Sequence, residues 1–371
     1  MKKTLCLILA ALLLLSFAGC GSQATTAPAE PAEAAEPAPA AEPAEEAAEE
    51  TVEEAPAPQA VSDGRARPSS CGSLQVIGGK LCSESGETVM LRGVSSHGVI
   101  PSESFFNDET FRELSEDIGV NVFRIAMYTF GVGSVGYCTN GDKARHEEDV
   151  INCVNLARDH DMYAIIDWHI LSDGDPNQFA DLAAAFFADM AGRFCDYNNV
   201  IYEICNEPNG VDWPTVKTYA EQIIPVIREK DPDSVILVGN PDWSKDLQSV
   251  ADDPLEFDNI LYSLHFYAAT HGQELRDLTE RLSQEGLPIF VTEYGVTAST
   301  GGFPRDLESA DLWIDLLERE NISYCMWSFS KAPEACSAIR STVLGYSGFS
   351  RDDFSATGQW LLDTLAAHRS R

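Results

Sequence analysis

Two glutamates in similar local settings carry the most informative chemistry of this sequence. Glu207 follows the apolar run Ile201–Cys205 and stands in an Asn-Glu-Pro tripeptide, and Glu293 ends a second apolar run that begins at Ile289. Short runs of this kind that stop abruptly at polar residues are typical of buried parallel strands. Two carboxyl groups at such strand ends can supply the acid/base and the nucleophile of glycoside hydrolysis.

Apolar runs alternate with amphipathic stretches from Cys71 onward, and this alternation predicts the fold. The predicted strands are 89–94, 120–127, 163–169, 200–206, 235–238, 260–266, 289–293 and 322–329, and the predicted helices are 108–118, 147–160, 178–195, 215–230, 273–284, 308–320 and 358–368. Eight strands in such a pattern favour an α/β protein with one closed (β/α)8 TIM barrel. Residues 73–87 are expected to form a hairpin that covers the barrel floor. A doubly wound sheet is the alternative.

One loop resembles a cofactor motif. Gly131–Gly136 matches G-x-G-x-x-G and follows a predicted strand. A dinucleotide site also needs a helix directly afterwards and an acidic residue about 20 positions later. The turn-like stretch Tyr137–Gly141 stands in place of that helix, and no such acidic residue closes a second strand. We therefore expect a loop here and no cofactor.

The predicted strand ends carry polar and aromatic side chains. In a TIM barrel the chemistry lies at the C-terminal ends of the strands, so these side chains should surround one mouth. A single buried His or Arg is more often structural than functional, but joint placement at successive strand ends favours one site. The residues concerned are His97, Arg124, Tyr128, His169, Asn206, Glu207, His265, Tyr267, Glu293 and Trp327.

Seven ordered motifs identify a resemblance. From about Leu74 to its end the chain resembles glycoside hydrolase family 5, and most of all its bacterial endo-β-1,4-glucanases. The matching segments are 91–98 (L-R-G-V-S-S-H-G), 123–128 (F-R-I-A-M-Y), 167–169 (D-W-H), 206–208 (N-E-P), 265–267 (H-F-Y), 292–295 (T-E-Y-G) and 327–329 (W-S-F). Their order and spread make the resemblance specific.

The resemblance implies roles that agree with the chemistry. Glu207 would be the general acid/base and Glu293 the nucleophile that forms a glycosyl-enzyme, which gives retention of configuration. Arg124 would keep Glu293 ionised through charge-assisted hydrogen bonds. Asn206 would donate to the sugar 2-hydroxyl.

Further side chains would complete the site. His265 and Tyr267 would orient the two glutamates, while substrate binding is expected from His97, Tyr128, His169 and Trp327, whose ring offers an apolar face to a pyranose. Outside this core the match weakens. Val99-Ile100-Pro101 stands where the family usually has a tryptophan, Trp243 matches another cleft aromatic, and Lys331 falls one position before the family's substrate-binding lysine. These departures leave the preferred glycan open.

Three functions fit these residues. The first is a retaining endo-β-1,4-glucanase acting on cellulose or mixed-linkage β-glucan by double displacement. The second is the same mechanism on mannan, xylan or xyloglucan, and the third is a surface glycan-binding protein without turnover. A zinc site of His97, His169 and His265 is also conceivable. It would leave Arg124 and Trp327 without a role, so we expect no metal.

The N-terminal part of the chain indicates export. Residues 1–20 resemble a lipoprotein signal peptide, with two lysines before an apolar run and with Cys20 as the predicted site of lipid attachment. An ordinary cleaved signal peptide is the alternative. We expect an exported protein, secreted or lipid-anchored to the outer face of the bacterial cell membrane. Residues 21–68 form a predicted disordered tether, because Gly21 to Ala60 contains ten Glu and no Lys or Arg. The catalytic domain is predicted over 69–371.

Charge and cysteines limit the partners and the disulfides. The formal net charge of −34 disfavours nucleic acid and anionic lipid, whereas a neutral β-glucan fits. Membrane contact is expected only through the lipid anchor, and we expect a monomer. Cys71 and Cys82 are the first candidates for a disulfide, while Cys205 and Cys325 lie in predicted core strands and are expected to be buried thiols.

Overall fold

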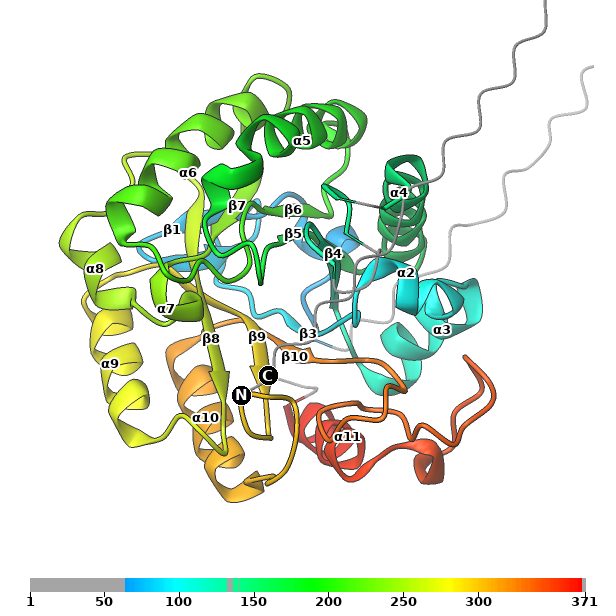
Figure 1. Cartoon of the computed structure of the whole chain (residues 1–371). Helices are drawn as coiled ribbons and strands as arrows, with labels where there is room; N and C mark the ends of the chain where they lie inside the picture. The colour runs from blue at the N-terminus through cyan, green and yellow to red at the C-terminus, as the bar shows by residue number, and fades with distance from the viewer. Residues whose placement is uncertain (1–63, 132–135, 140, 369–371) are drawn as a thin grey trace, which may run out of the picture. The chain divides into compact units, whose positions relative to one another are not determined.

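Eight parallel strands close into a barrel in the computed structural model of the chain (Figure 1), which describes residues 64–131, 136–139 and 141–368. The signal segment, Cys20 and almost all of the tether therefore lie outside the described residues. The strands are β3 (Arg92–Ser95), β4 (Val122–Tyr128), β5 (Tyr163–His169), β6 (Val200–Glu203), β7 (Val235–Val238), β8 (Ile260–Tyr267), β9 (Ile289–Gly295) and β10 (Tyr324–Trp327). Each pairs in parallel with the next, and β10 closes on β3. The predicted TIM barrel is confirmed.

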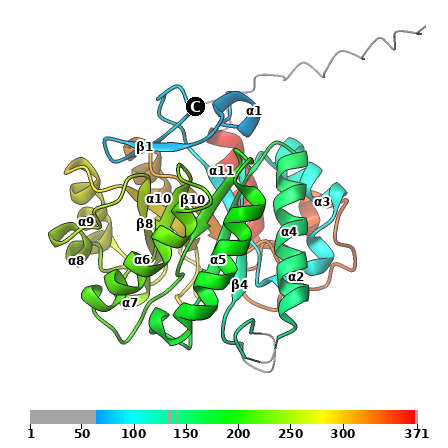
Figure 2. The same ribbon diagram turned by 90° about the horizontal axis from the view of Figure 1, so that it is seen from above.

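Helices surround the barrel on its outside (Figures 1 and 2). The main ones are α3 (Asp108–Arg112), continued by a π-helical turn η2 (Glu113–Ile118), α4 (Lys143–Asp159), α5 (Ala180–Phe194), α6 (Trp213–Arg228), α9 (Gln273–Gln284), α10 (Leu307–Glu320) and α11 (Ala356–His368). All seven predicted helices are present. The short α8 (Leu247–Asp252) was not predicted, because its two buried apolar residues, Leu247 and Val250, are too few to show a helical period.

Side-chain caps explain where many of these helices begin. An Asn or Asp side chain directly before α3, α4, α6, α8 and α10 accepts a hydrogen bond from a backbone N–H of the first turn. Such caps satisfy donors that the helix itself leaves unpaired. The capping residues are Asn107, Asp142, Asp212, Asp246 and Asp306.

The barrel floor is closed by the predicted hairpin. Strands β1 (Gln75–Ile77) and β2 (Lys80–Cys82) are antiparallel and lie across one end of the barrel (Figure 2). Leu74 and Leu81 are buried against an apolar layer that the barrel strands contribute. The Val76 N–H donates to Asn259 Oδ1 (2.9 Å), just before β8 begins, so the hairpin covers the N-terminal ends of the strands. The opposite end, where the strands finish, stays free for the site.

The cysteines correct one prediction. All eight between Cys71 and Cys336 are free, so the predicted bond between Cys71 and Cys82 is wrong. The two sulfur atoms have separate partners: Cys71 Sγ lies 3.6 Å from Ser70 Oγ, and Cys82 Sγ donates to the Lys80 carbonyl oxygen (3.6 Å). Cys205 and Cys325 are buried thiols as predicted, and burial raises the pKa of both above the usual range of a thiol.

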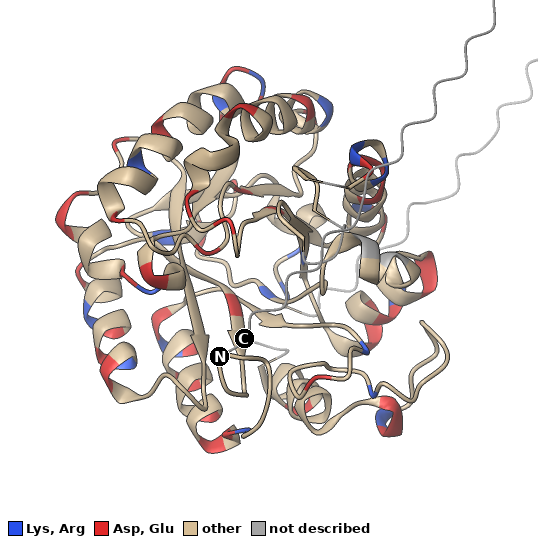
Figure 3. Ribbon diagram, in the orientation of Figure 1, with Lys and Arg blue, Asp and Glu red and all other residues tan. Residues whose placement is uncertain are grey.

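Most acidic residues lie on the outside of the barrel domain. Asp and Glu residues are spread along the outer helices and their connecting loops (Figure 3). Among the described residues, no helix combines the length and apolarity that crossing a bilayer requires.

Replacement of Gly93 by alanine tests how tightly the barrel wall is packed. A Cβ atom at Gly93 would lie 2.2 Å from the Val122 carbonyl oxygen and 3.0 Å from Cys325 Sγ. We expect Gly93→Ala to lower the free energy of unfolding by about 1–3 kcal/mol through overpacking. Gly192→Ala in α5 is the control, because nothing lies within 4 Å of the added atom. There the free energy should rise by about 0.5–1 kcal/mol. Equal denaturation midpoints of the two variants would contradict this account.

Candidate active site

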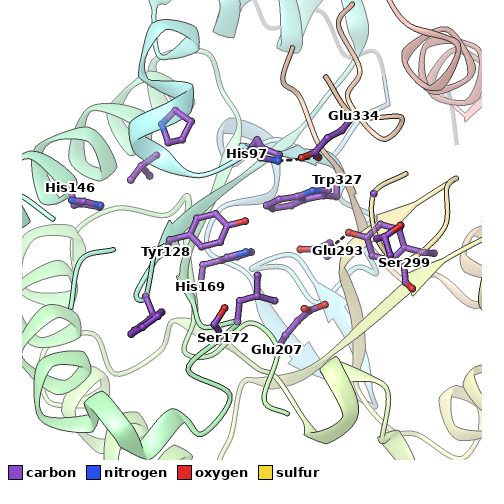
Figure 4. Close-up of a pocket in the computed structure, with 18 residues that line it drawn as sticks. His97, Tyr128, His146, His169, Ser172, Glu207, Glu293, Ser299, Trp327 and Glu334 are labelled. Atoms are coloured by element: carbon purple, nitrogen blue, oxygen red, sulfur yellow. Dashed lines mark hydrogen bonds and ion pairs between the residues drawn. The ribbon is translucent and has the colours of Figure 1, made fainter. Parts of the chain in front are cut away.

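A cavity of about 510 Å3 lies at the C-terminal ends of the barrel strands (Figure 4). Seven residues of the predicted site line it, each from a different strand or the loop directly after it. They are His97, Tyr128, His169, Glu207, Tyr267, Glu293 and Trp327. Arg124, Asn206 and His265 lie directly behind this lining, where they contact the two glutamates or each other. The side chains at the strand ends thus converge on one cavity, as predicted.

The two glutamates approach each other closely. One carboxylate oxygen of Glu207 lies within 4.8 Å of one of Glu293. Retaining glycosidases hold their two carboxyl groups about 5–5.5 Å apart, whereas inverting ones need about 6.5–9.5 Å to accommodate a water molecule. The separation in this site therefore favours a direct attack by one carboxylate.

Glu293 is held as an acceptor from two sides. Tyr267 Oη donates to Oε1 (2.7 Å) and Arg124 Nη1 donates to Oε2 (3.1 Å). Only 4% of Glu293 is exposed, and β9 pairs with β8 so that Glu293 lies beside His265. Two donors on separate oxygens hold this carboxylate in one orientation.

Glu207 has the opposite electrostatic setting. Burial raises the pKa of Glu207 from 4.5 to about 7, although Arg124 and Lys245 act to lower it. Its carboxyl group contacts His265, whose Nδ1 lies 2.9 Å from Oε1. Burial lowers the pKa of His265 to about 4, so this imidazole is neutral near pH 7. A carboxyl group with a pKa near 7 can hold a proton and release it, as an acid/base must.

Arg124 joins the catalytic strands. Its side chain is fully buried on β4. Burial acts to lower the pKa of this guanidinium, but the neighbouring carboxylates Asp167, Glu203 and Glu293 outweigh it and raise the pKa well above the usual value. Besides Glu293, its guanidinium contacts Asp167 on β5 (2.9 Å), Glu203 on β6 (2.7 Å) and the Asn206 side-chain oxygen (2.6 Å). One cation on β4 therefore contacts groups from three other strands, β5, β6 and β9.

Stacked rings form one wall of the cavity. The His169 ring lies 5.2 Å from the Trp327 ring at an angle of 9°, and the Tyr128 ring meets His169 edge-on at 4.3 Å. Asp167 Oδ2 holds His169 Nδ1 at 2.6 Å, and burial lowers the pKa of His169 to about 3. His97 lies 5.3 Å from Trp327 on the same wall. A neutral, rigid aromatic surface suits the apolar face of a sugar ring.

Two residues expected to bind substrate lie outside this cavity. Trp243 is 46% exposed and lines a neighbouring depression beyond the loop that carries Glu207. Lys331 faces away: its Nζ donates to the carbonyl oxygens of Val343 and Leu344 (3.3 Å each) and lies 3.4 Å from the Tyr346 ring centre. The structure therefore does not bring Lys331 to the cavity.

Several contacts of the site were not predicted from the sequence, although Asp167 was expected at a strand end near the mouth. Glu203 and Asp167 are buried partners of Arg124, Thr292 holds His265 Nε2 (2.9 Å), and Glu334 contacts His97 (3.2 Å) at the cavity. A charged residue that interrupts an apolar strand, as Glu203 does in V-I-Y-E, is the signal that could have found the first of them. Thr292 and Glu334 carry no comparable signal.

The metal alternative finds no support among the described residues. Only one group of three His, Cys, Asp or Glu side chains has its potential ligand atoms in mutual reach, namely Glu207, His265 and Glu293. His97 and His169 are not part of it. These three side chains already satisfy one another or their neighbours through the hydrogen bonds described above.

The similarity to known proteins agrees with this geometry. The family model described as cellulase (glycosyl hydrolase family 5) matches residues 82–333. Endoglucanase A of Butyrivibrio fibrisolvens is 41% identical over 321 residues, which cover 85% of this chain and 73% of that protein. An endoglucanase of Clostridium saccharobutylicum is 41% identical over 296 residues, which cover 79% of this chain but only 65% of that protein. The chain thus spans just under two thirds of the second relative.

A solved structure shows the same arrangement of the chain. The catalytic domain of a Thermobifida fusca endoglucanase, in a variant complexed with cellotetraose, superposes with a TM-score of 0.77 at 35% identity. The superposition covers 81% of this chain and all of that domain. Because the family match spans the whole barrel and both glutamate-bearing strands, the chain belongs to glycosyl hydrolase family 5.

Proposed function

We propose that the chain is a retaining endo-β-1,4-glucanase that hydrolyses internal bonds of cellulose or mixed-linkage β-glucan by double displacement. The observation that carries the reaction class is the close approach of Glu207 and Glu293 with opposite electrostatic settings. Relatives named endoglucanases, at 41% identity, support the polymer.

In the first step Glu293 attacks the anomeric carbon while Glu207 donates its proton to the departing glycosidic oxygen. The bond between the sugar and Glu293 forms as the bond to the leaving sugar breaks. In the second step the ionised Glu207 takes a proton from water, and the resulting hydroxide displaces Glu293. Each carboxyl group thus returns to its starting form.

The surrounding donors divide the work. Arg124 and Tyr267 each donate to one oxygen of Glu293 and so hold its carboxylate in a fixed orientation. The Asn206 amide is oriented at both ends, because its oxygen accepts from Arg124 and its nitrogen donates to the Ile170 carbonyl (2.9 Å). One amide hydrogen remains for the sugar 2-hydroxyl, whose contact strengthens in an oxocarbenium-like transition state.

A panel of polymers tests the substrate. We expect reducing-sugar release from carboxymethyl cellulose and barley β-glucan, and little from mannan or xylan, because the aromatic wall and the named relatives fit a glucan. Glu293→Gln is the matched control: it keeps the size of the side chain but removes the nucleophile, so release should stop on every polymer. A clear preference for mannan or xylan would instead support the second function, the same mechanism acting on one of those polymers. No release from any polymer would favour a glycan-binding protein.

The pKa of Glu207 predicts the alkaline limit of activity. Since burial raises this pKa to about 7, Glu207 is protonated below that pH and loses its proton above it. We expect kcat/KM on β-glucan to fall tenfold per pH unit well above pH 7, measured at constant ionic strength. In Glu207→Ala, assayed with an activated aryl β-cellobioside, this alkaline limb should disappear. Its persistence at the same pH would assign the titration to another group.

Removal of the acid should act selectively on poor leaving groups. We expect Glu207→Ala to lower kcat/KM on β-glucan by about 10²–10⁴-fold, the usual contribution of general acid catalysis. Dinitrophenyl β-cellobioside needs no protonation of its leaving group, so its glycosylation rate should change far less. Initial rates on the two substrates, with burst kinetics for the aryl glycoside, make the comparison. Equal losses on both would contradict the acid role.

A further inference from the structure

The loop between β7 and β8 is hydrogen-bonded to the backbone around Glu207. Three of its donors reach three carbonyl oxygens that flank this residue: Gly239 N–H to Cys205 (3.1 Å), Ser244 Oγ to Asn206 (2.6 Å) and Trp243 N–H to Pro208 (3.1 Å). A Cβ atom at Gly239 would lie only 2.3 Å from the Cys205 oxygen. The two backbones are therefore in direct contact, and a glycine is required at that position.

This loop contains a left-handed turn. Asp242, Trp243 and Ser244 have φ angles of 56°, 57° and 55°. Side chains other than glycine rarely adopt such angles, because the Cβ atom approaches the following carbonyl oxygen. Within the described residues no other non-glycine positions with positive φ are adjacent in sequence. A conformation of this kind persists only where the surrounding contacts impose it.

The turn places neighbouring side chains on opposite sides. Trp243 is 46% exposed, whereas Ser244 is completely buried behind the Glu207 loop. The Ser244 hydroxyl accepts from the Asn240 N–H (3.3 Å) and donates to the Asn206 carbonyl oxygen, so both of its roles are used. That carbonyl belongs to the peptide unit whose nitrogen is the backbone nitrogen of Glu207. The hydroxyl is therefore hydrogen-bonded to the peptide group that connects Asn206 to Glu207.

We propose that Ser244 is a positioning residue for Glu207: its hydroxyl fixes the plane of the Asn206–Glu207 peptide and so aims the carboxyl group at the leaving oxygen. The inference rests on the proposed acid/base role of Glu207. Nothing in the reaction passes through Ser244 itself. Its effect is geometric, and misplacement of a catalytic group by about 1 Å can cost about 10²-fold in rate.

Two substitutions separate the hydroxyl from the turn. Ser244→Ala removes the hydroxyl but keeps the strained φ, and Ser244→Gly removes the hydroxyl while glycine adopts the left-handed turn without steric cost. Both are made in the full chain and assayed on aryl β-cellobiosides of graded leaving-group pKa and on β-glucan. We expect kcat/KM to fall about 10–100-fold for poor leaving groups and to change little for dinitrophenyl. The plot of log kcat/KM against leaving-group pKa should steepen in both variants.

Ser323→Ala is the matched control. Ser323 is buried at the floor end of the barrel, where its hydroxyl accepts from the Leu91 N–H (2.9 Å), so the variant also loses a buried hydrogen bond to the backbone. Its leaving-group slope should equal that of the wild type, whatever happens to its denaturation midpoint. Because Ser244→Gly relieves the strain, it provides a folded variant even if Ser244→Ala is unstable.

The outcomes distinguish the inference from the proposed function. If both Ser244 variants keep the wild-type slope, or lose activity equally on good and poor leaving groups, the positioning role is overturned while the acid role of Glu207 stands. If Glu207→Ala itself shows equal losses on both substrate classes, the acid role falls, and the positioning role falls with it. A steepened slope in Ser244→Ala and Ser244→Gly, and not in Ser323→Ala, supports the inference.

Discussion

The active site depends on one buried cation. Arg124 contacts carboxylates from β5, β6 and β9 and the amide of Asn206, all inside the barrel. Removing a charge from water is costly unless partners compensate it, and removing one partner of a buried set leaves the others uncompensated. The same contacts that make Arg124 tolerable in the core also fix the position of Glu293. The hydrogen bonds of Arg124 therefore both stabilise the buried charge and position the residues of the candidate site.

A single guanidinium cannot neutralise every nearby carboxyl group. The acidic residues of the site therefore differ in their electrostatic surroundings. Glu293 accepts direct hydrogen bonds from Arg124 and Tyr267. Burial raises the pKa of Asp167 to about 8, despite Arg124, and that of Glu207 to about 7. Burial therefore favours the protonated forms of Asp167 and Glu207, whereas Glu293 is held by two direct donors. Environments that separate the pKa values of neighbouring acids are a general way of assigning acid and base.

The two ends of the barrel serve different purposes. At the floor, the β1–β2 hairpin covers an apolar layer that includes Leu91, Ile165 and Phe290. At the mouth, loops contact one another through polar groups. The 239–244 loop, for example, donates three hydrogen bonds to backbone carbonyl oxygens around Glu207. The floor is closed by apolar packing, whereas the carboxylates around Arg124 gather toward the ends of the strands. This separation allows the mouth to carry chemistry without loss of the fold.

The sequence by itself determined the barrel, its hairpin and the strand ends that carry Glu207 and Glu293, because apolar periodicity and the polar residues that interrupt it are local features. It also predicted the partners His265, Tyr267 and Arg124 through ordered motifs. Only the tertiary structure decided which side chains meet across the chain. The Glu203–Arg124 contact, the Lys331 contacts with loop carbonyls and the free thiols of Cys71 and Cys82 depend on the relative placement of distant segments. The left-handed turn at Ser244 is of the same kind: tertiary contacts impose a backbone conformation that local preference disfavours, so no local pattern announces it.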